Sequence, residues 1–152
     1  MNTDERQLSF YHTHTGDSLD VVYSRGGEYI DSALDEIEAF LADFRSGDYG
    51  TIDPELLDFV YDIRQQIGSR DTYEVISAYR SPKTNEMLRN RNNDSGVAEN
   101  SLHLVGKAID VRLRGVELQQ LRDAAIALQR GGVGYYEESD FLHLDTGRVR
   151  RW

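Results

Sequence analysis

The hydrophobic pattern changes along the chain from strand-like alternation to helical spacing. Residues 7–24, QLSFYHTHTGDSLDVVYS, alternate apolar and polar positions and turn at Thr15 to Asp17, which predicts a pair of strands. A stripe at helical spacing follows and stops at Gly47, which predicts an amphipathic helix; its apolar positions are Ile30, Leu34, Ile37, Leu41 and Phe44.

A second helix is marked at both of its ends. Asp53 is a suitable N-cap, Pro54 fits the first helical position, and Gly68 is a typical helix terminator. The apolar residues between these ends keep the helical period; they are Leu57, Val60, Ile63 and Ile67. We therefore expect two amphipathic helices in the first half of the chain.

The second half of the chain contains several short strand patterns and two further helices. Residues 73–81, YEVISAYRS, predict a strand that ends before Pro82, and a short helix and a polar loop over 90–100 should follow. The remaining elements that we predict are a strand at 106–113, a helix at 115–132, and strands at 132–136 and 141–145. Helices on a small, mostly antiparallel sheet make an α+β fold, and we expect residues 1–152 to form a single domain.

Charge and composition exclude several kinds of partner. The net charge of -10 argues against binding to nucleic acid or to anionic membranes, since both require a positive surface. No run of about 18 apolar residues occurs, so we expect no membrane insertion, and the opening MNTDERQLSF lacks the pattern of a secretory signal. The chain has no cysteine, so any bound metal must be held by His, Asp or Glu.

His103, Asp110 and His143 could together provide such a metal site. A catalytic zinc ion needs three protein ligands and one open position, and His and carboxylate ligands satisfy this requirement. His103 should lie where a loop enters a strand, with Asp110 on that strand and His143 on a neighbour, and Gly106 and Ala108 should let the backbone approach the metal. The spacing alone leaves open the alternative that these are ordinary hydrogen-bonded residues.

A second pair of histidines, His12 and His14, also has a spacing that can bind zinc, because residues two apart on a strand share a face. No third ligand accompanies them at a useful spacing. We therefore interpret both as surface residues of the turn HTHTGD.

Several motifs in the same order along the chain resemble a known family. SAYRSPKTN, SLHLVGKAID and FLHLD are similar to the elements YRS, SxHxxGxAxD and a later His in zinc peptidases of the D-Ala-D-Ala carboxypeptidase and dipeptidase type, the VanY and VanX relatives. The opening LSFYHTHTGDSL and the closing GVGYYEESDFLHLDTGRVRRW resemble the YcbK-type murein endopeptidase branch. The resemblance extends over nearly the full length of the chain.

The resemblance implies roles for particular residues. It implies that His103, Asp110 and His143 bind Zn²⁺ and that Arg80 holds the substrate carbonyl as it becomes an oxyanion, although Arg80 could instead tie down its loop. The general base would be Asp140, three positions before the last ligand.

Other candidate site residues have two readings each. Asp145, as the competitor for the base, would either reach the metal pocket or fix an imidazole. Ser101 either bonds near the site or caps a turn, and Tyr135 either lines a substrate cleft or packs in the core, as does Tyr136. Trp152 is interpreted as an anchor for the tail.

The implied activity is that of a zinc-dependent murein peptidase, an endopeptidase or a carboxypeptidase, acting on peptidoglycan peptide stems at the periplasmic or extracellular face. One alternative is a zinc-containing cell-wall binding module without hydrolysis, as in hedgehog-like domains of the same fold. Another is a structural domain without metal. The bond that is cut and the oligomeric state stay open at this point.

Overall fold

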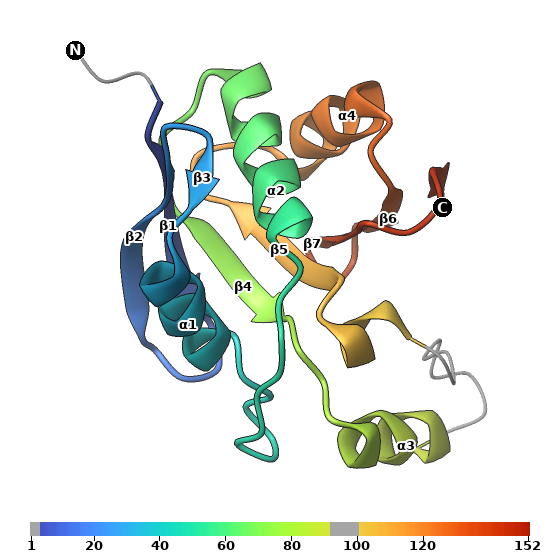
Figure 1. Cartoon of the computed structure of the whole chain (residues 1–152). Helices are drawn as coiled ribbons and strands as arrows, with labels where there is room; N and C mark the ends of the chain where they lie inside the picture. Colours follow the sequence, from blue (N-terminus) through green and yellow to red (C-terminus); the bar gives the residue numbers. More distant parts are fainter. Residues whose placement is uncertain (1–3, 92–100) are drawn as a thin grey trace.

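A computed structural model describes residues 4–91 and 101–152 of the chain. Its strands form one eight-stranded sheet in the order β3-β2-β1-β4-β5-β7-β6-β8. The helices α1, α2 and α4 are packed beside this sheet (Figure 1). The elements are β1 (Arg6–His12), β2 (Ser18–Arg25), β3 (Glu28–Tyr29), α1 (Asp31–Phe40), α2 (Pro54–Ile67), β4 (Tyr73–Ser77), α3 (Pro82–Asn90), the short 3₁₀ helix η1 (Leu102–Val105), β5 (Ala108–Leu113), α4 (Leu118–Leu128), β6 (Gly132–Tyr136), β7 (Phe141–Asp145) and β8 (Arg150–Arg151).

The sheet is mixed but mostly antiparallel, which confirms the α+β class. β1 pairs antiparallel with β2 as the opening pattern predicted, and the chain turns between them at Thr13 to Asp17. Parallel pairing occurs between β1 and β4 and between β6 and β8. The pairs β4–β5, β5–β7 and β6–β7 are antiparallel, so the centre of the sheet is built from the second half of the chain.

Helix α2 has the ends that its sequence predicted. The Asp53 side chain accepts a hydrogen bond from the Glu55 N–H, Pro54 occupies the first turn, and Gly68 ends the helix with a φ of 82°. A glycine fits there because a left-handed backbone conformation is strained for other residues.

Helix α1 is shorter than the hydrophobic stripe predicted, because it ends at Phe40. Beyond this end the chain folds around Asp43, which is only 1% exposed. The Asp43 carboxylate accepts hydrogen bonds from the backbone N–H groups of Arg45 and Ser81. Leu41 is nevertheless fully buried, so the apolar stripe correctly identified core residues but not the end of the helix.

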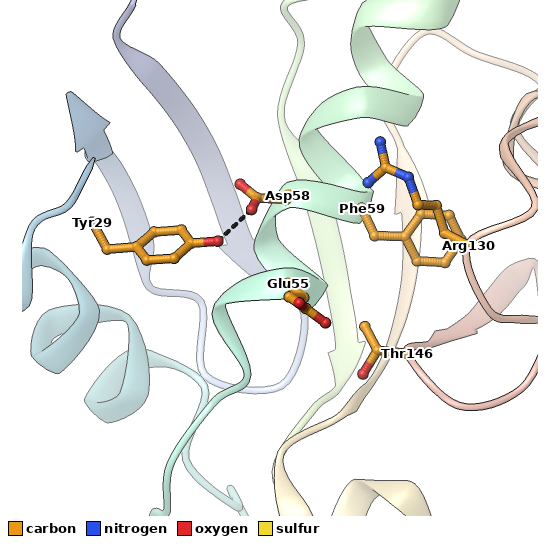
Figure 2. Close-up of a pocket in the computed structure, with 6 residues that line it drawn as sticks. All are labelled: Tyr29, Glu55, Asp58, Phe59, Arg130 and Thr146. Carbon is orange, nitrogen blue, oxygen red and sulfur yellow. Dashed lines mark hydrogen bonds between the residues drawn. The ribbon is translucent and has the colours of Figure 1, made fainter. Parts of the chain in front are cut away.

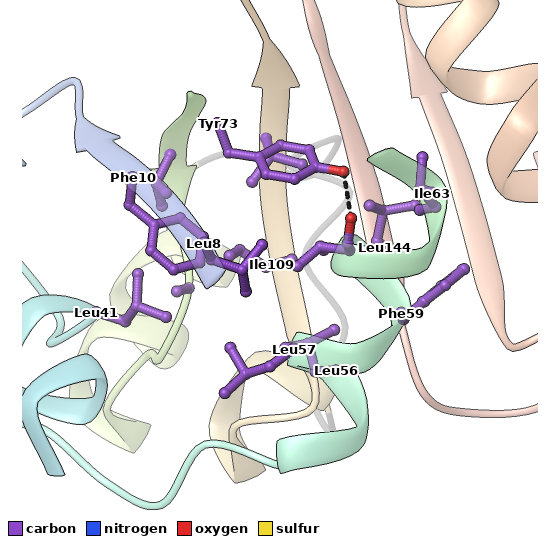
Figure 3. Packing of buried hydrophobic residues seen from close by; sticks show 14 of the residues in the cluster. Leu8, Phe10, Leu41, Leu56, Leu57, Phe59, Ile63, Tyr73, Ile109 and Leu144 are labelled. Atoms are coloured by element: carbon purple, nitrogen blue, oxygen red, sulfur yellow. Dashed lines mark hydrogen bonds between the residues drawn. The ribbon is translucent and has the colours of Figure 1, made fainter. Parts of the chain in front are cut away.

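The apolar core lies between the helices and one face of the sheet (Figure 3). Every second residue of the central strands points into it, including Ile109 on β5 and Leu144 on β7. The phenol of the fully buried Tyr73 donates a hydrogen bond of 2.6 Å to the carbonyl of Val60 on α2. The intervening residues of β5 and β7, among them Asp110 and His143, therefore point to the opposite face of the sheet.

Helix α3 follows β4 as predicted and begins at Pro82. The side chain of its N-cap, Ser81, accepts a hydrogen bond from the Thr84 N–H. The polar loop predicted for residues 90–100 lies outside the described residues from position 92 onward. Within the described part of the chain, no helix has the length and apolar character needed to cross a membrane.

Candidate metal centre

The candidate ligands His103, Asp110 and His143 come together on the face of the sheet that α2 and α4 leave uncovered. Each residue offers one ligand atom, and these atoms lie within 4.8 Å of one another. Asp110 on β5 and His143 on β7 are direct partners in the antiparallel register. His103 lies on η1, just before β5, so the predicted entry from a loop is in fact a short 3₁₀ turn.

The imidazole of His103 is held by a backbone carbonyl. Its Nδ1 lies 2.6 Å from the carbonyl oxygen of Ala78, just beyond the end of β4. Because a carbonyl can only accept a hydrogen bond, Nδ1 must carry the proton and donate. The other nitrogen, Nε2, lies 3.3 Å from Asp110 Oδ2. His103 is only 3% exposed. The lone pair of Nε2 is therefore the one that the ring presents to the site.

The imidazole of His143 lies between two carboxylates. Its Nδ1 is 3.0 Å from Asp110 Oδ1, and its Nε2 is 2.7 Å from Asp145 Oδ2. Burial opposes a charge on this ring, but the hydrogen bonds to Asp110 and Asp145 outweigh burial and raise the pKa of His143 to about 9. The two carboxylates thus favour a positive charge on the His143 ring. A metal ion bound between Asp110 and His143 would supply a positive charge at the same place.

Asp145 is fully buried and all of its acceptor capacity is used. Besides His143, its carboxylate accepts hydrogen bonds from the backbone N–H groups of Gly132 and Gly147 and two from the Arg150 guanidinium, at 2.8 and 2.9 Å. Burial alone would raise the pKa of Asp145, but the hydrogen bonds to His143 and Arg150 hold it well below its usual range. Of the two roles considered for Asp145, this geometry matches the fixing of the His143 ring.

These contacts suit a metal ion. Histidines that bind metals usually donate their second ring N–H to a carboxylate or a backbone carbonyl, which fixes the tautomer. His103 does so with Ala78 and His143 with Asp145, so the second nitrogen of each ring faces Asp110 and can bind a metal ion that replaces the proton on His143. Burial disfavours a charge on Asp110, yet His103 and His143 keep the pKa of this carboxyl far below its usual range. Asp110 is therefore an anion, as a metal ligand should be.

Arg80 lies close to the three ligands, in the loop between β4 and α3. Its backbone N–H donates to the carbonyl of His103 at 3.1 Å, and its Nη1 donates to Asn85 Oδ1 at 3.1 Å. Its side-chain Nε is buried and has no hydrogen-bond partner within residues 4–91 and 101–152. Burial lowers the pKa of Arg80, and the charge of Asp110 opposes this shift. The guanidinium stays charged at neutral pH because its ordinary pKa is so high.

Two other predictions concern the turn that carries His103. Ser101 is the N-cap of η1, and its hydroxyl accepts a hydrogen bond from the His103 N–H at 3.2 Å. Gly106 has a φ of 68°, and a Cβ there would lie 1.8 Å from the carbonyl oxygen of Thr51. The close approach at Gly106 is thus to the loop before α2, rather than to the metal site as the sequence suggested.

Asp140 is not a member of the ligand cluster, and Tyr135 lies on the opposite face of the sheet. Asp140 lies in the turn between β6 and β7, and its exposed carboxylate is 3.9 Å from Arg112 on β5. Tyr135 is on the core face of β6, where the Arg122 guanidinium lies 4.6 Å from its ring centroid. The packing alternative for Tyr135 is the one that this position matches.

The sequence interpretation missed residues from the end of the chain. The Trp152 ring centroid lies 5.3 Å from that of His143, although Trp152 was interpreted only as a tail anchor. Arg150, which the sequence interpretation did not consider, also reaches this region through Asp145. Tyr136, for which a place in a substrate cleft was one of two readings, reaches it through Trp152. No sequence signal could have placed Arg150 and Trp152 here, because β8 has only 2 residues and its pairing with β6 cannot be predicted from alternation.

The two histidines of the first turn do not join the metal centre. His12 is 1% exposed, so its interpretation as a surface residue was wrong; its ring packs against Phe40 and Phe44. His14 is the exposed member and stacks on Phe44 at a centroid distance of 3.9 Å. Within the described part of the chain, His103, Asp110 and His143 form the one cluster of potential ligands.

A separate hollow of about 310 Å³ lies beside α2 (Figure 2). Tyr29 from β3 reaches across it and donates a hydrogen bond to Asp58, and Arg130 pairs with Asp62 near by. These two contacts link α2 to β3 and to the segment after α4. Among the described residues, the side chains that line the hollow form no cluster of potential metal ligands.

The fold and the site together define a class of protein, the metallopeptidases. A family model described as "Peptidoglycan L,D-endopeptidase MepK" matches residues 1–152. The chain belongs to this family of metallopeptidases, which confirms the resemblance to the YcbK-type branch.

Individual relatives agree with this assignment. The chain is 40% identical over 147 residues to the peptidoglycan L,D-endopeptidase MepK of Escherichia coli strain K12, a match that covers 97% of this chain and 80% of the relative. It is also 40% identical over 148 residues to a probable peptidoglycan L,D-endopeptidase MepK of Haemophilus influenzae, covering 97% of this chain and 78% of that relative. No solved structure matches the chain significantly.

Proposed function

We propose that this chain is a zinc-dependent endopeptidase that cleaves the bond between two diaminopimelate residues in cross-linked peptidoglycan stems. The observation that carries the proposal is the buried convergence of His103, Asp110 and His143 within 4.8 Å in a chain of this family. The substrate and its location follow from the relatives, whose name describes a peptidoglycan enzyme. We accordingly place the activity at the periplasmic or extracellular face, where peptidoglycan lies.

The term L,D-endopeptidase in the name of the relatives distinguishes between the two types of peptidoglycan cross-link. An L,D-endopeptidase cleaves a bond whose carbonyl belongs to an L centre and whose nitrogen belongs to a D centre. A cross-link between two diaminopimelates joins such centres, whereas a cross-link from D-Ala to diaminopimelate joins two D centres. The first type of cross-link is therefore the substrate that we expect.

The metal that we propose is zinc, held by His103 Nε2, the Asp110 carboxylate and His143 Nδ1. A set of three His and carboxylate ligands leaves a fourth position open, as catalytic zinc sites do. When bound, zinc supplies a Lewis acid that polarises a carbonyl and lets water act as a nucleophile near neutral pH. Ala78 and Asp145 contribute by fixing the two imidazole rings in the required tautomers.

Arg80 is the residue that we assign to the developing oxyanion. Arg80 is 8% exposed, and its guanidinium remains charged and retains a buried Nε without a partner in the described residues. A donor group that is buried and already oriented stabilises negative charge more strongly than one in water. The hydrogen bond from Nη1 to Asn85 holds the guanidinium in place. The same bond is compatible with the alternative role, in which Arg80 ties down its loop.

The proton acceptor is the least supported role. Asp145 is unsuited to it because its oxygens are already occupied by hydrogen-bond donors and its pKa is held low. Asp140 stays a prediction; its exposed carboxylate lies 3.9 Å from Arg112, which is on the same face of β5 as the candidate ligand Asp110. If Asp140 is the base, Asp140→Asn will lower kcat strongly while metal affinity stays unchanged; an unchanged kcat would remove it from the mechanism.

The proposed activity is tested by cleavage of defined muropeptides. Zinc-loaded protein is incubated separately with a dimer linked through two diaminopimelates, a dimer linked through D-Ala, and a pentapeptide monomer that ends in D-Ala-D-Ala. Products are identified by mass spectrometry, with His103→Ala as the control. We expect cleavage of the first dimer alone and no cleavage by the variant.

Each other outcome has a definite meaning. Cleavage of the monomer alone would make the protein a carboxypeptidase. Bound zinc without cleavage of any of these compounds would favour the cell-wall binding module.

A further inference from the structure

Three aromatic side chains form a continuous surface beside the metal centre, which we name the aromatic shelf: Trp152, Tyr136 and Phe141. The Trp152 ring centroid is 5.3 Å from that of the candidate ligand His143. Its Nε1 donates a hydrogen bond of 2.8 Å to the Tyr136 hydroxyl, and the Tyr136 ring stacks on Phe141 at 4.8 Å. The shelf therefore begins at a ligand and extends along β6 and β7.

The position of Trp152 is fixed by its backbone and by a glycine. Its N–H donates to the Val133 carbonyl, and its carbonyl accepts from the Tyr135 N–H, so that it continues the pairing of β8 with β6. Its ring lies directly against Gly134, where a Cβ would come within 2.7 Å of the ring atoms. Gly134 is the register partner of His143. The ring thus occupies a space that only a glycine at this position leaves beside the ligand.

The shelf remains open to solvent. Trp152 is 50% exposed and Tyr136 is 38% exposed. Contiguous exposed apolar surface often marks a site of interaction. Since this surface adjoins a proposed catalytic centre, the segment of substrate next to the scissile bond is what would reach it.

A separate cavity of about 420 Å³ lies at this sheet edge on the side that faces α4. Arg122 and Arg151 both line it, together with Trp152. Arg122 is paired with Asp123 at 2.9 Å, whereas Arg151 makes no ion pair with any residue in the described ranges. Because Val133 is the strand partner of Arg151 and also lines this cavity, both arginines lie on the face of the sheet opposite the shelf. The shelf itself therefore offers an aromatic surface, which favours an aliphatic part of a ligand.

We propose that the aromatic shelf is the subsite for the aliphatic side chain of a diaminopimelate residue. This inference rests on the proposed function, because it names the part of that substrate which the shelf binds. The methylene groups of diaminopimelate suit the faces of Trp152 and Tyr136, as the stems of long charged residues do in proteins. Trp152 is therefore a specificity-determining residue rather than a tail anchor.

The single tryptophan of the chain allows a direct binding test. Zinc-loaded protein is titrated with the tripeptide L-Ala-D-Glu-diaminopimelate, which contains no cross-link, while Trp152 emission is recorded. The matched control peptide carries L-Ala in the third position. We expect a saturable change in emission with the first peptide and about tenfold weaker binding of the second, equal to about 1.4 kcal/mol. No change in emission at concentrations well above the KM for the dimer would overturn the proposal.

Variants separate binding from a structural effect on His143. Trp152→Ala should raise the KM for the diaminopimelate-linked dimer about tenfold, and Trp152→Phe should restore part of the loss because it retains an aromatic face. Zinc affinity, measured by competition with a chelator, should stay unchanged in both. The control is Tyr29→Ala, an exposed aromatic on β3 at the opposite edge of the sheet, for which we expect no change in KM.

The outcomes distinguish this proposal from the proposed function. A protein that cleaves the dimer with an unchanged KM in Trp152→Ala would retain the function and overturn the shelf. A lower zinc affinity in Trp152→Ala, with no rescue of KM by Trp152→Phe, would reduce Trp152 to a support for His143 and also overturn the subsite. A protein that binds the tripeptide at Trp152 and cleaves no dimer would support the subsite and exclude the endopeptidase.

Discussion

The substitution Asp145→Asn tests how the ring of His143 is held. Asp145 is fully buried and accepts from His143 Nε2, so the ring presents Nδ1 without a proton when a metal is bound. An Asn side chain can direct its NH₂ group toward His143 Nε2, which forces the proton of the neutral ring onto Nδ1. The ring would then present a donor to the metal, and binding would require a less favourable tautomer or a different side-chain orientation.

The magnitude of this effect follows from the contacts that are lost. Substitution of a residue that orients a metal ligand typically lowers metal affinity by about 10–100-fold, and we expect this range for Asp145→Asn. Removing one partner of a buried ion pair costs about 3–5 kcal/mol. We expect about 2 kcal/mol here, because Asn retains an acceptor for Gly132 and Gly147 and because the Arg150 side chain is 28% exposed.

The assays are chelator competition for zinc affinity and urea unfolding, followed by circular dichroism, for the free energy of unfolding. Asp140→Asn is the matched control, since it makes the same chemical change at an exposed carboxylate of the same hairpin. We expect the control to retain both zinc affinity and stability. The reasoning is refuted if Asp145→Asn binds zinc as tightly as the unsubstituted protein.

Three further predictions concern other parts of the fold. Burial of Asp43 opposes its ionisation, but hydrogen bonds from the backbone N–H groups of Ser81 and Arg45 outweigh burial and lower the pKa of Asp43. The ionised Asp43 therefore stabilises the fold at a pH above the unfolded pKa of about 4, and this stabilisation is lost as the pH falls. The difference in free energy of unfolding between the unsubstituted protein and Asp43→Asn should therefore shrink in urea titrations below about pH 4, and a constant difference would contradict this. Gly106→Ala should destabilise the protein by more than about 3 kcal/mol, because the new Cβ would meet the backbone of Thr51. The control Gly26→Ala has a similar φ but open space around it, and it should cost about 1 kcal/mol. Thermal unfolding measures both losses of stability, and equal losses would refute the close approach at Gly106. Gly134→Ala should displace the Trp152 ring and shift its emission, and an unchanged spectrum would show that the ring does not lie against this glycine.

The sequence predicted most of the fold because its local signals agreed with the tertiary structure. Asp53, Pro54 and Gly68 define the ends of α2, and these signals act within one turn of the helix. The hydrophobic stripe failed to locate the end of α1, because the helix there gives way to long-range hydrogen bonds from Asp43 to Ser81. A contact between residues 38 positions apart leaves no periodic signal in the sequence.

The candidate site was predictable to the extent that its residues lie within recognisable motifs. His103, Asp110 and His143 come together because two of them lie on paired strands and the third on the adjoining turn. Two other contacts depend on how β8 pairs with β6. They are the hydrogen bonds from Arg150 to Asp145 and the contact between the rings of Trp152 and His143. Since β8 (Arg150–Arg151) is only 2 residues long, its strand pairing could not be inferred from alternation.

The central claim is that one metal ion, held by His103, Asp110 and His143, is required to hydrolyse an L,D cross-link. The most direct test is a time course of cleavage of the diaminopimelate-linked dimer by protein stripped with a chelator, before and after zinc is restored in measured steps. The account predicts no cleavage by stripped protein and full activity when one zinc per chain has been added. Cleavage at the full rate by protein shown to be free of metal would contradict it.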